Sequence, residues 1–260
     1  MKHKETVLIT GASGGIGKEL AELFAKEGRN LVLVARSMEN LMEVKKEIES
    51  KYNVTITIFS KDLSIEAEIV SLFDEVNEQN LQIDYLVNNA GFGLYGEFIN
   101  TDLGKELNMI DLNIRTVTHL TKLFLPGMVE RNNGGVMNIA STASFQPGPL
   151  MSVYYATKAY VLSFTEALQN EMKGTNIRIT AVCPGPTETN FGNRASMHES
   201  RLFQGAIGDV KDVAKTAYDG FFSGKTIVIP GLSNKLLAGS VRFMPRKFVT
   251  SIVRKIQERV

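Results

Sequence analysis

Two tyrosines stand just before a lysine in residues 154–158, a spacing that could support proton transfer. Side chains three or four residues apart lie on the same face of a helix, about one turn from each other. A tyrosine has a pKa of about 10, and lowering it to about 7 takes about 4 kcal/mol of preferential stabilisation of the phenolate. The ammonium group of Lys158 can contribute to that stabilisation. Tyr154, four residues before Lys158, and Tyr155, three before it, both satisfy the spacing.

A glycine-rich turn near the start of the chain could bind phosphate. The segment Thr10-Gly11-Ala12-Ser13-Gly14-Gly15-Ile16-Gly17 follows a short apolar run and opens a helical pattern. A pyrophosphate needs backbone donors and little side-chain bulk, which a glycine turn and a helix N-terminus supply together. We expect Gly11 to permit the tight turn, Gly15 to let the backbone approach the phosphates, and Gly17 to let the helix pack close to the sheet. Ser13 can add a hydroxyl donor.

Short apolar runs alternate regularly with helical patterns along the chain. The predicted strands cover Val7–Ile9, Asn30–Ala35, Val54–Phe59, Ile83–Val87, Val136–Ile139, Ile177–Val182 and Thr226–Ile229. The predicted helices run from the glycine turn to Glu27 and over Asn40–Lys51, Ile65–Asn77, Leu107–Val129 and Tyr155–Met172. Strands that are apolar throughout are typical of parallel sheets covered on both faces. We therefore predict an α/β fold, a doubly wound parallel sheet of about seven strands with helices on both faces.

The composition is that of an ordinary globular chain of 260 residues with a net charge of +1, which gives no reason to expect nucleic acid as a partner. We predict one domain over residues 1–232, with residues 233–260 as its helical C-terminal extension. The single cysteine, Cys183, rules out an internal disulfide and is expected to be buried. We expect no metal site. The start of the chain lacks a signal-peptide pattern and no apolar stretch is long enough to span a membrane, so we predict a cytoplasmic protein.

The order and form of these motifs resemble those of the short-chain dehydrogenase/reductase family, a group of Rossmann-fold enzymes. The family's turn is Thr-Gly-x-x-x-Gly-x-Gly, and the resemblance spans roughly Thr6 to Pro230. It implies an adenine contact at Asp62 and Leu63. Beyond these and the glycine turn, the implied cofactor-binding residues are Asn89, Ala90 and Gly91 at the adenosine half, and Pro184, Gly185, Thr187 and Thr189 at the nicotinamide and pyrophosphate.

The resemblance also selects one of the two tyrosines. The family pattern is Tyr-x-x-x-Lys with a serine on the preceding strand, which Ser141 matches, and this favours Tyr154 over Tyr155. Tyr154 would give a proton to a carbonyl oxygen or take one from an alcohol, and Ser141 would bond the same oxygen. Lys158 would hold the nicotinamide ribose and lower the tyrosine pKa. Asn113 matches the family asparagine that keeps a helix bent and positions a proton-relay water.

The end of the second predicted strand favours NADP(H) over NAD(H). NAD-specific members carry a carboxylate there, which bonds the ribose hydroxyls and repels a 2′-phosphate. This chain has Ala35 at that position, followed by Arg36, whose guanidinium can pair with a phosphate, and Ser37, which can add a third donor. Many NADP-dependent members carry a second basic residue in the glycine turn, where this chain has Gly14. The alternative is that Arg36 only opens the following helix in water.

Apolar residues near the expected site predict a hydrophobic substrate pocket, although several of them could simply pack on the core. We expect the pocket to be formed by Ser141 with Phe92, Leu94, Phe145, Met151 and Phe191, under a lid over residues 190–209 that carries Met197, Leu202 and Phe203. Such a pocket would suit a keto-acyl chain, a steroid-like ketone or an aldehyde. The family implies a homodimer or homotetramer joined through the helices Leu107–Val129 and Tyr155–Met172.

The segment after Pro230 interleaves basic and apolar residues at helical spacing. Such a segment can lie on an anionic membrane surface, or it can pack on its own domain or a partner subunit, and we favour packing. Two other functions compete with a working reductase: a catalytically inactive NADP-binding regulatory or scaffold protein, and a lipid-surface protein acting through this tail. The complete set of Asn113, Ser141, Tyr154 and Lys158 argues against the inactive protein, since binding alone does not need proton-transfer groups.

Overall fold

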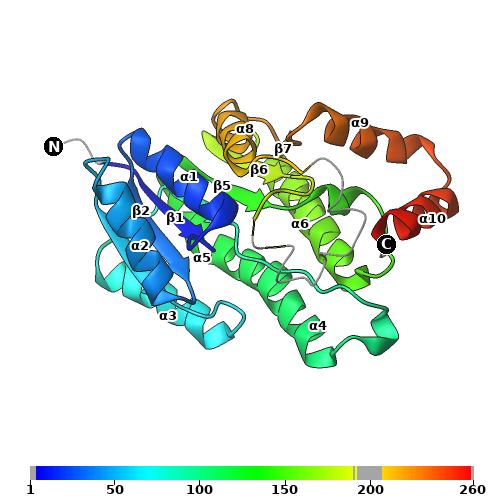
Figure 1. Ribbon diagram of the computed structural model, residues 1–260. Coiled ribbons are helices and arrows are strands. Elements are labelled where there is room, and N and C mark those ends of the chain that lie inside the picture. The colour runs from blue at the N-terminus through cyan, green and yellow to red at the C-terminus, as the bar shows by residue number, and fades with distance from the viewer. Residues whose placement is uncertain (1–3, 190, 192–206, 259–260) are drawn as a thin grey trace.

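Seven parallel strands form a single sheet with helices on both faces (Figure 1). The computed structural model describes residues 4–189, 191 and 207–258. The strands are β1 (Thr6–Thr10), β2 (Asn30–Ala35), β3 (Ile56–Ser60), β4 (Tyr85–Asn88), β5 (Gly134–Ile139), β6 (Ile177–Val182) and β7 (Ile227–Val228). Their order in the sheet is β3-β2-β1-β4-β5-β6-β7, and each pair of neighbours is parallel. The predicted fold class is confirmed.

The helices connect successive strands and then continue beyond the sheet. They are α1 (Gly15–Lys26), α2 (Met38–Glu49), α3 (Glu66–Glu78), α4 (Leu103–Ile110), α5 (Thr116–Glu130), α6 (Ser152–Glu171), α8 (Val210–Phe222), α9 (Leu232–Ser240) and α10 (Arg246–Gln257). A π-helical turn, Asp111–Arg115, joins α4 to α5, and short 3-10 turns occupy Phe98–Asn100, Thr142–Phe145 and Val241–Phe243. No described helix is both long and apolar enough to cross a bilayer.

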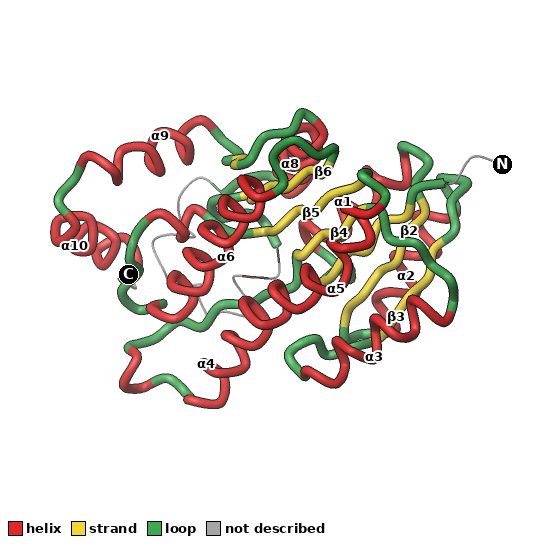
Figure 2. The backbone as a smooth tube through the Cα atoms, turned by 180° about the vertical axis from the view of Figure 1, so that it is seen from behind, coloured by secondary structure: helices red, strands yellow, loops and turns green. Residues whose placement is uncertain are grey.

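Two apolar layers hold the sheet between its helices. One layer joins the sheet to α1, α2 and α8, and the other joins it to α3 and α5, which Figure 2 shows from the opposite side together with α6. In β1 the side chains of Val7 and Ile9 enter the first layer and that of Leu8 enters the second, and all three are fully buried. Because both faces of the strand are covered, every position along it is apolar or buried.

Two helix predictions differ from the structure by more than two residues, and one helix was missed. Helix α6 begins at Ser152, three residues before the predicted start, so Tyr154 stands inside the helix. The predicted helix Leu107–Val129 begins at Leu103 and is divided by the π-helical turn. Helix α8 was not predicted, although its buried residues Val213, Ala217 and Phe221 stand at helical spacing.

The direction of the chain reverses between β1 and β4, and this reversal positions the site. From β1 the chain builds outward to β2 and β3, then returns to β4 on the other side of β1. The loops that follow the two central strands therefore separate, leaving a crevice at the carboxyl edge of the sheet. The glycine turn follows β1 and Asn89 follows β4, while Ser141 follows β5. All the motifs singled out in the sequence thus meet at one edge.

Candidate active site

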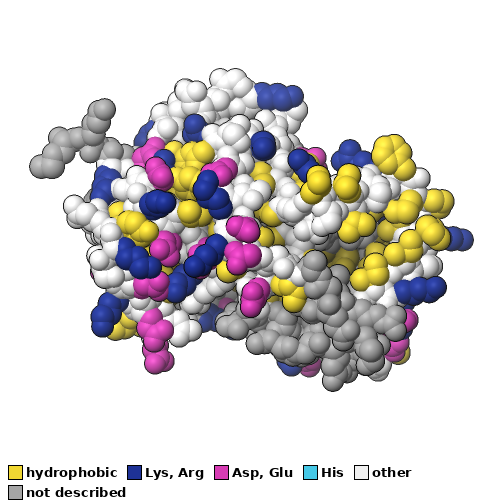
Figure 3. Space-filling view, turned by 45° about the horizontal axis from the view of Figure 1, so that its top comes forward, with side chains coloured by type: hydrophobic (Ala, Val, Ile, Leu, Met, Phe, Trp, Pro, Cys, Tyr) yellow, Lys and Arg dark blue, Asp and Glu magenta, His cyan; other side chains and the backbone are white. Residues whose placement is uncertain are grey.

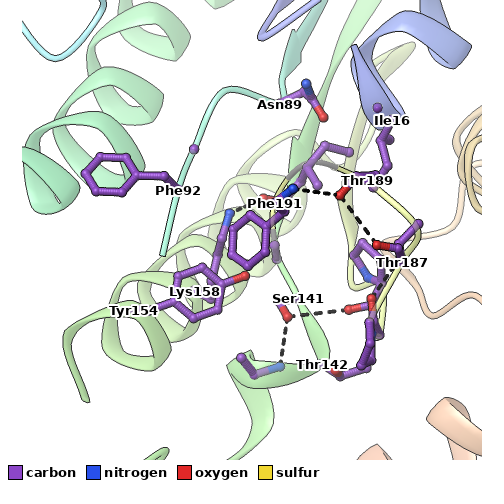
Figure 4. A pocket seen from close by; sticks show the side chains of 18 of the residues that line it. Ile16, Asn89, Phe92, Ser141, Thr142, Tyr154, Lys158, Thr187, Thr189 and Phe191 are labelled. Carbon is purple, nitrogen blue, oxygen red and sulfur yellow. Dashed lines mark hydrogen bonds between the residues drawn. The ribbon is translucent and has the colours of Figure 1, made fainter. Parts of the chain in front are cut away.

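A cavity of about 770 Å³ opens at the carboxyl edge of the sheet. Its walls come from the loops after β1 to β6, from α6 and from the C-terminal helices (Figure 4). Of the cofactor residues predicted from the sequence, the cavity is lined by Gly11, Ser13, Gly15, Ile16, Arg36, Ser37, Asp62, Leu63, Asn89, Ala90, Gly91, Tyr154, Lys158, Pro184, Gly185, Thr187 and Thr189. Gly17 and Asn113, which were also predicted for the site, do not line the cavity.

Close backbone contacts define the glycine turn. Gly11 has a φ of +65°, in the left-handed region that glycine adopts most readily. A Cβ on Gly17 would lie 2.5 Å from the Gly11 carbonyl oxygen and 2.5 Å from Asn89 Nδ2, so only glycine lets α1 start this close to the sheet. Helix α1 begins without a side-chain cap, and the positive end of its dipole faces the crevice. These features suit a pyrophosphate.

Asn89 fixes the turn to the loop after β4. Its Nδ2 donates to the carbonyl oxygens of Thr10 at 2.9 Å and Gly11 at 3.1 Å. In return the Thr10 hydroxyl oxygen accepts from the backbone nitrogens of Asn89 and Ala90, at 2.9 and 3.0 Å. The two central loops therefore form one hydrogen-bonded unit. Asn89 was predicted as a cofactor-binding residue, and this structural role is additional to that prediction.

Arg36 presents an accessible cation at the end of β2. Its side chain is 69% exposed, and the nearest carboxylate contact is a long one, 3.9 Å from Nη1 to Asp62 Oδ2. The neighbouring cation Lys61 already has partners within the protein, since its Nζ donates to Ser71 Oγ at 2.8 Å and to Glu75. Ser37 caps α2, where its Oγ accepts from Asn40 N at 3.2 Å. The guanidinium group is therefore the cation best placed to meet an anion here.

Tyr154, Ser141 and Lys158 meet on the side of the cavity formed by α6 and β5, where Figure 4 shows the tyrosine and serine hydroxyls near each other. The Ser141 Oγ accepts from Ala143 N at 3.1 Å, which holds the hydroxyl in place. Lys158 Nζ donates to Ile139 O at 2.8 Å and lies 5.9 Å from the centre of the Tyr154 ring. Both Tyr154 and Lys158 are buried.

The electrostatics of this group correct one prediction. Burial raises the pKa of Tyr154 above its usual value, and a hydrogen bond with Ser141 only partly offsets this. Burial also lowers the pKa of Lys158 to about 8. The expected lowering of the Tyr154 pKa by Lys158 is therefore wrong in this structure, because desolvation outweighs the other effects and the lysine ammonium bonds the Ile139 carbonyl. The neutral phenol that results is the form that donates a proton.

Tyr155, the alternative on spacing, serves a different purpose. Its hydroxyl accepts a short hydrogen bond from Gln257 Nε2 at the end of α10, and burial raises its pKa to about 12. Tyr95 reinforces the same junction by donating from its hydroxyl to Gln257 O at 2.7 Å. Tyr155 therefore anchors the C-terminal helix, whereas Tyr154 carries the bond with Ser141.

Asn113 lies buried in the π-helical turn between α4 and α5. Its Oδ1 accepts from Phe92 N at 3.2 Å, and its Nδ2 donates to Phe92 O at 3.0 Å and to Thr157 Oγ1 at 3.1 Å. One side chain thus joins the loop after β4 to α6. A π-turn is costly and occurs often at functional sites. Asn113 positions the helix that carries Tyr154.

Some of the residues predicted for the substrate pocket line the cavity and others do not. Phe92, Met151 and Phe191 line the cavity with Ser141, and the rings of Phe191 and Tyr154 lie 5.4 Å apart. Leu94 and Phe145 were wrongly assigned, since neither lines the cavity. Leu94 packs on the cluster around Met109 and Tyr155, and Phe145 packs on the one around Val117 and Ala140.

Most of the predicted lid, with Met197, Leu202 and Phe203, lies outside the described residues. Its described edge includes Thr189, whose Oγ1 accepts from Phe191 N at 3.2 Å and whose methyl would lie 3.1 Å from a Cβ on Gly15. Thr187 donates from its Oγ1 to Gly185 O at 2.9 Å. The segment after β6 therefore lies over the glycine turn.

The C-terminal helices supply a wall that the sequence analysis did not assign to the site. From this segment the cavity is lined mainly by Leu237, Val241, Met244, Val249, Ile252, Val253 and Ile256. The apolar spacing of Val249, Val253 and Ile256 indicates a helix with one apolar face, and it was the one available signal. Cys183 is buried and burial raises its pKa to about 12, so it takes no part as a thiolate. No metal-binding cluster occurs among the described residues.

Comparisons with known proteins point to one family. A sequence model described as short chain dehydrogenase matches residues 5–200. The very-long-chain 3-oxoacyl-CoA reductase of Rattus norvegicus is 37% identical over 186 residues, 69% of this chain but only 58% of that enzyme. The NADP-dependent 3-hydroxy acid dehydrogenase of Schizosaccharomyces pombe is 36% identical over 189 residues, 72% of this chain and 73% of that one.

Solved structures agree over the whole chain. A short-chain dehydrogenase from Sphingobium yanoikuyae, in complex with NADPH, matches with a TM-score of 0.83 and 31% identity over 98% of each chain. The bulky-bulky ketone specific alcohol dehydrogenase of Comamonas testosteroni matches with a TM-score of 0.78 and 28% identity, over 98% of this chain and 96% of that one. The likeness includes the region of α9 and α10.

The packing at Gly17 predicts a sharp difference between two glycines of one turn. Gly17→Ala places a methyl group against Asn89 and the Gly11 carbonyl, which are fixed by hydrogen bonds, and should lower the free energy of unfolding by about 1–3 kcal/mol. Gly14→Ala meets nothing within 4 Å and should cost less than about 1 kcal/mol. Urea denaturation of both variants measures the difference. Equal stability of the two would contradict the described packing.

Proposed function

The chain belongs to the short-chain dehydrogenase family, and from this premise we propose that it is an oxidoreductase that transfers a hydride between NADP(H) and a carbonyl compound or secondary alcohol. The observation that carries the proposal is the meeting of Tyr154 and Ser141 in the cavity that also contains the glycine turn. A buried phenol bonded to a serine beside a dinucleotide-sized crevice is suited to proton transfer coupled to hydride transfer.

The residues present fit a dinucleotide. No side chain caps the start of α1, so backbone N–H groups there are available to a ligand. Arg36 offers an exposed guanidinium where a 2′-phosphate would lie. The turn would bind the pyrophosphate, and Lys158 would hold the nicotinamide ribose. When bound, the nicotinamide supplies or accepts the hydride.

The proton takes a separate route through the protein. In reduction, Tyr154 donates its phenolic proton to the carbonyl oxygen as the carbonyl carbon gains the hydride, so the products are the alcohol, NADP⁺ and the tyrosinate. Ser141 donates a hydrogen bond to the same oxygen and stabilises its developing charge. In oxidation the same residues act in reverse. Asn113 holds α6 in register through Thr157.

Two observations support NADP(H) as the cofactor. Strand β2 ends at Ala35 without the carboxylate that would repel a 2′-phosphate, and Arg36 follows it. Among relatives, the Sphingobium structure is a complex with NADPH and the fission yeast enzyme is named NADP-dependent.

We propose a hydrophobic carbonyl substrate, such as a keto-acyl chain, a steroid-like ketone or an aldehyde. Phe92, Met151 and Phe191 near Tyr154, with the apolar wall from α10, support this choice. So do the names of relatives that act on 3-oxoacyl-CoA and on bulky ketones. An inactive binding protein is disfavoured, because Ser141, Tyr154 and Lys158 are all present and line the same cavity.

Assembly and location follow as proposals. We propose a homodimer or homotetramer joined through α4, α5 and α6, which expose Leu103 and Leu107 on α4, Val129 on α5 and Tyr160 on α6. Apolar side chains on neighbouring helices are typical of such interfaces. We propose a cytoplasmic location, which suits a protein whose single cysteine is a free, buried thiol.

The two neighbouring tyrosines predict opposite outcomes on loss of a hydroxyl. Tyr154→Phe removes the proton donor and should lower kcat for NADPH-dependent reduction by about 10²–10⁴-fold while NADPH binding persists. Tyr155→Phe removes only the bond to Gln257 and should retain kcat within about tenfold. A panel of carbonyl substrates followed at the nicotinamide absorbance, with NADPH binding measured by fluorescence, tests both. Substantial residual turnover of Tyr154→Phe would reject the assignment.

Arg36 predicts the cofactor preference. Arg36→Asp replaces a charged hydrogen-bond donor with a repelling carboxylate, so KM for NADPH should rise by about ten- to a hundredfold and KM for NADH should change much less. Lys46→Asp, an exposed charge reversal on α2 outside the cavity, is the matched control and should leave both constants unchanged. Initial rates with both cofactors measure this. A wild-type preference for NADH would overturn the NADP(H) proposal.

A further inference from the structure

The C-terminal helices expose an unusual concentration of large apolar side chains. We define the α9–α10 face as the exposed residues of 232–256, and Figure 3 shows its hydrophobic side chains gathered on one side of the molecule. Phe243 is 90% exposed, and the other large apolar residues of the face are Leu232, Leu236, Leu237, Phe248 and Ile256. Single exposed apolar residues are ordinary, but a contiguous group marks an interaction surface.

The same face carries only positive charge. Residues 231–257 include six lysines and arginines and no aspartate or glutamate. Of the six, Arg254 pairs with Glu97 and Glu258, at 3.3 and 3.5 Å. No carboxylate of the described residues forms an ion pair with the five exposed ones, Lys235, Arg242, Arg246, Lys247 and Lys255. The net charge of the whole chain is only +1, so this concentration of positive charge is confined to the C-terminal segment.

The apolar surface continues into the cavity. Leu237 and Ile256 are 65% and 43% exposed, and both also line the cavity that contains Tyr154. Helix α10 is held in place by Gln257 at its end, which forms hydrogen bonds with Tyr155 and Tyr95. The α9–α10 face and the wall of the cavity therefore share these two residues.

We propose that the α9–α10 face docks on an anionic lipid bilayer, with its cations at the lipid headgroups and Phe243 and Leu236 in the interfacial layer. A helix with basic residues beside an apolar face binds such surfaces, and juxtamembrane lysines and arginines add attraction to anionic lipid. The association is peripheral, since no described helix can span a bilayer.

Charge decides between a bilayer and a second copy of this chain. A two-fold interface brings the same patch of both subunits together, so the five exposed cations would face each other without intervening carboxylates. Like charges at an interface cost energy, whereas anionic headgroups complement them. The subunit interface proposed above lies on α4, α5 and α6 and leaves this face free.

Docking also places this part of the cavity wall beside the lipid. A lipophilic carbonyl compound dissolved in the bilayer would then reach Tyr154 along Leu237 and Ile256 without crossing water. This consequence rests on the proposed reductase function, whereas the docking itself does not.

Co-sedimentation of the full chain with two kinds of vesicle tests the docking. One kind is phosphatidylcholine alone, and the other contains phosphatidylserine as well. We expect binding to the anionic vesicles, weaker binding to the neutral ones, and a marked loss as salt is raised, since salt screens exposed charges.

Two sets of variants test the two halves of the face. The apolar variant is Leu236→Ser with Phe243→Ser, neither of which lines the cavity. The charge variant is Lys235→Gln, Arg242→Gln and Lys247→Gln, which should weaken binding by about a hundredfold at roughly fivefold per charge. The matched controls replace exposed residues outside the face, Met42→Ser for the first and Lys26→Gln, Lys46→Gln and Lys225→Gln for the second. The controls should bind as the wild type does.

The outcomes separate the proposals. Failure of the wild type to bind anionic vesicles, or equal binding by the face variants and their controls, overturns the docking. The docking is also overturned if the wild type binds no vesicles and is a dimer in sedimentation velocity, while the apolar variant is a monomer. The face would then be a subunit interface. Both face variants should reduce a water-soluble ketone at the wild-type rate. Vesicle binding by a chain that reduces no carbonyl compound would instead reject the proposed function and leave the docking intact.

Discussion

The hydrogen bonds between Asn89 and the glycine turn are the junction on which the site depends. They join the loops after β1 and β4, the two central strands between which the chain reverses direction. Because Gly17 leaves no room for a side chain there, α1 starts directly against this junction and aims its N-terminus at the crevice. Further along the loop after β4, Phe92 bonds Asn113 in the π-helical turn, which fixes this loop to the helices beyond it.

Burial gives the proton-transfer group its character. Tyr154 and Lys158 lie on consecutive turns of α6, and desolvation favours the neutral form of both. Each is held by a polar partner on or after β5, Tyr154 by Ser141 and Lys158 by the Ile139 carbonyl. The phenol thus begins as an acid, suited to reduction. Oxidation requires further stabilisation of the phenolate, and a bound nicotinamide cation would contribute to it.

Local patterns were enough to predict the sheet and the motif loops. Strands such as β1 are buried on both faces and therefore read as continuous apolar runs, and loops that follow parallel strands must share one edge. The errors have long-range causes. Leu94 and Phe145 are apolar residues close in sequence to the site, yet each faces a core cluster, a choice made by tertiary packing. Tyr155 meets Gln257 across 102 positions of sequence, so no local pattern could show that α10 forms a wall of the cavity.

The central claim is that hydride from NADPH and a proton from Tyr154 reach the same carbonyl group. The most direct measurement uses NADPH carrying two deuterium atoms at the nicotinamide C4 position, with mass spectrometry of the alcohol formed from a hydrophobic ketone. We predict one deuterium on the carbinol carbon with the wild-type protein, and about 10²–10⁴-fold slower formation of labelled alcohol with Tyr154→Phe. Alcohol formed without deuterium, or labelled alcohol formed equally well by Tyr154→Phe, would contradict the central claim.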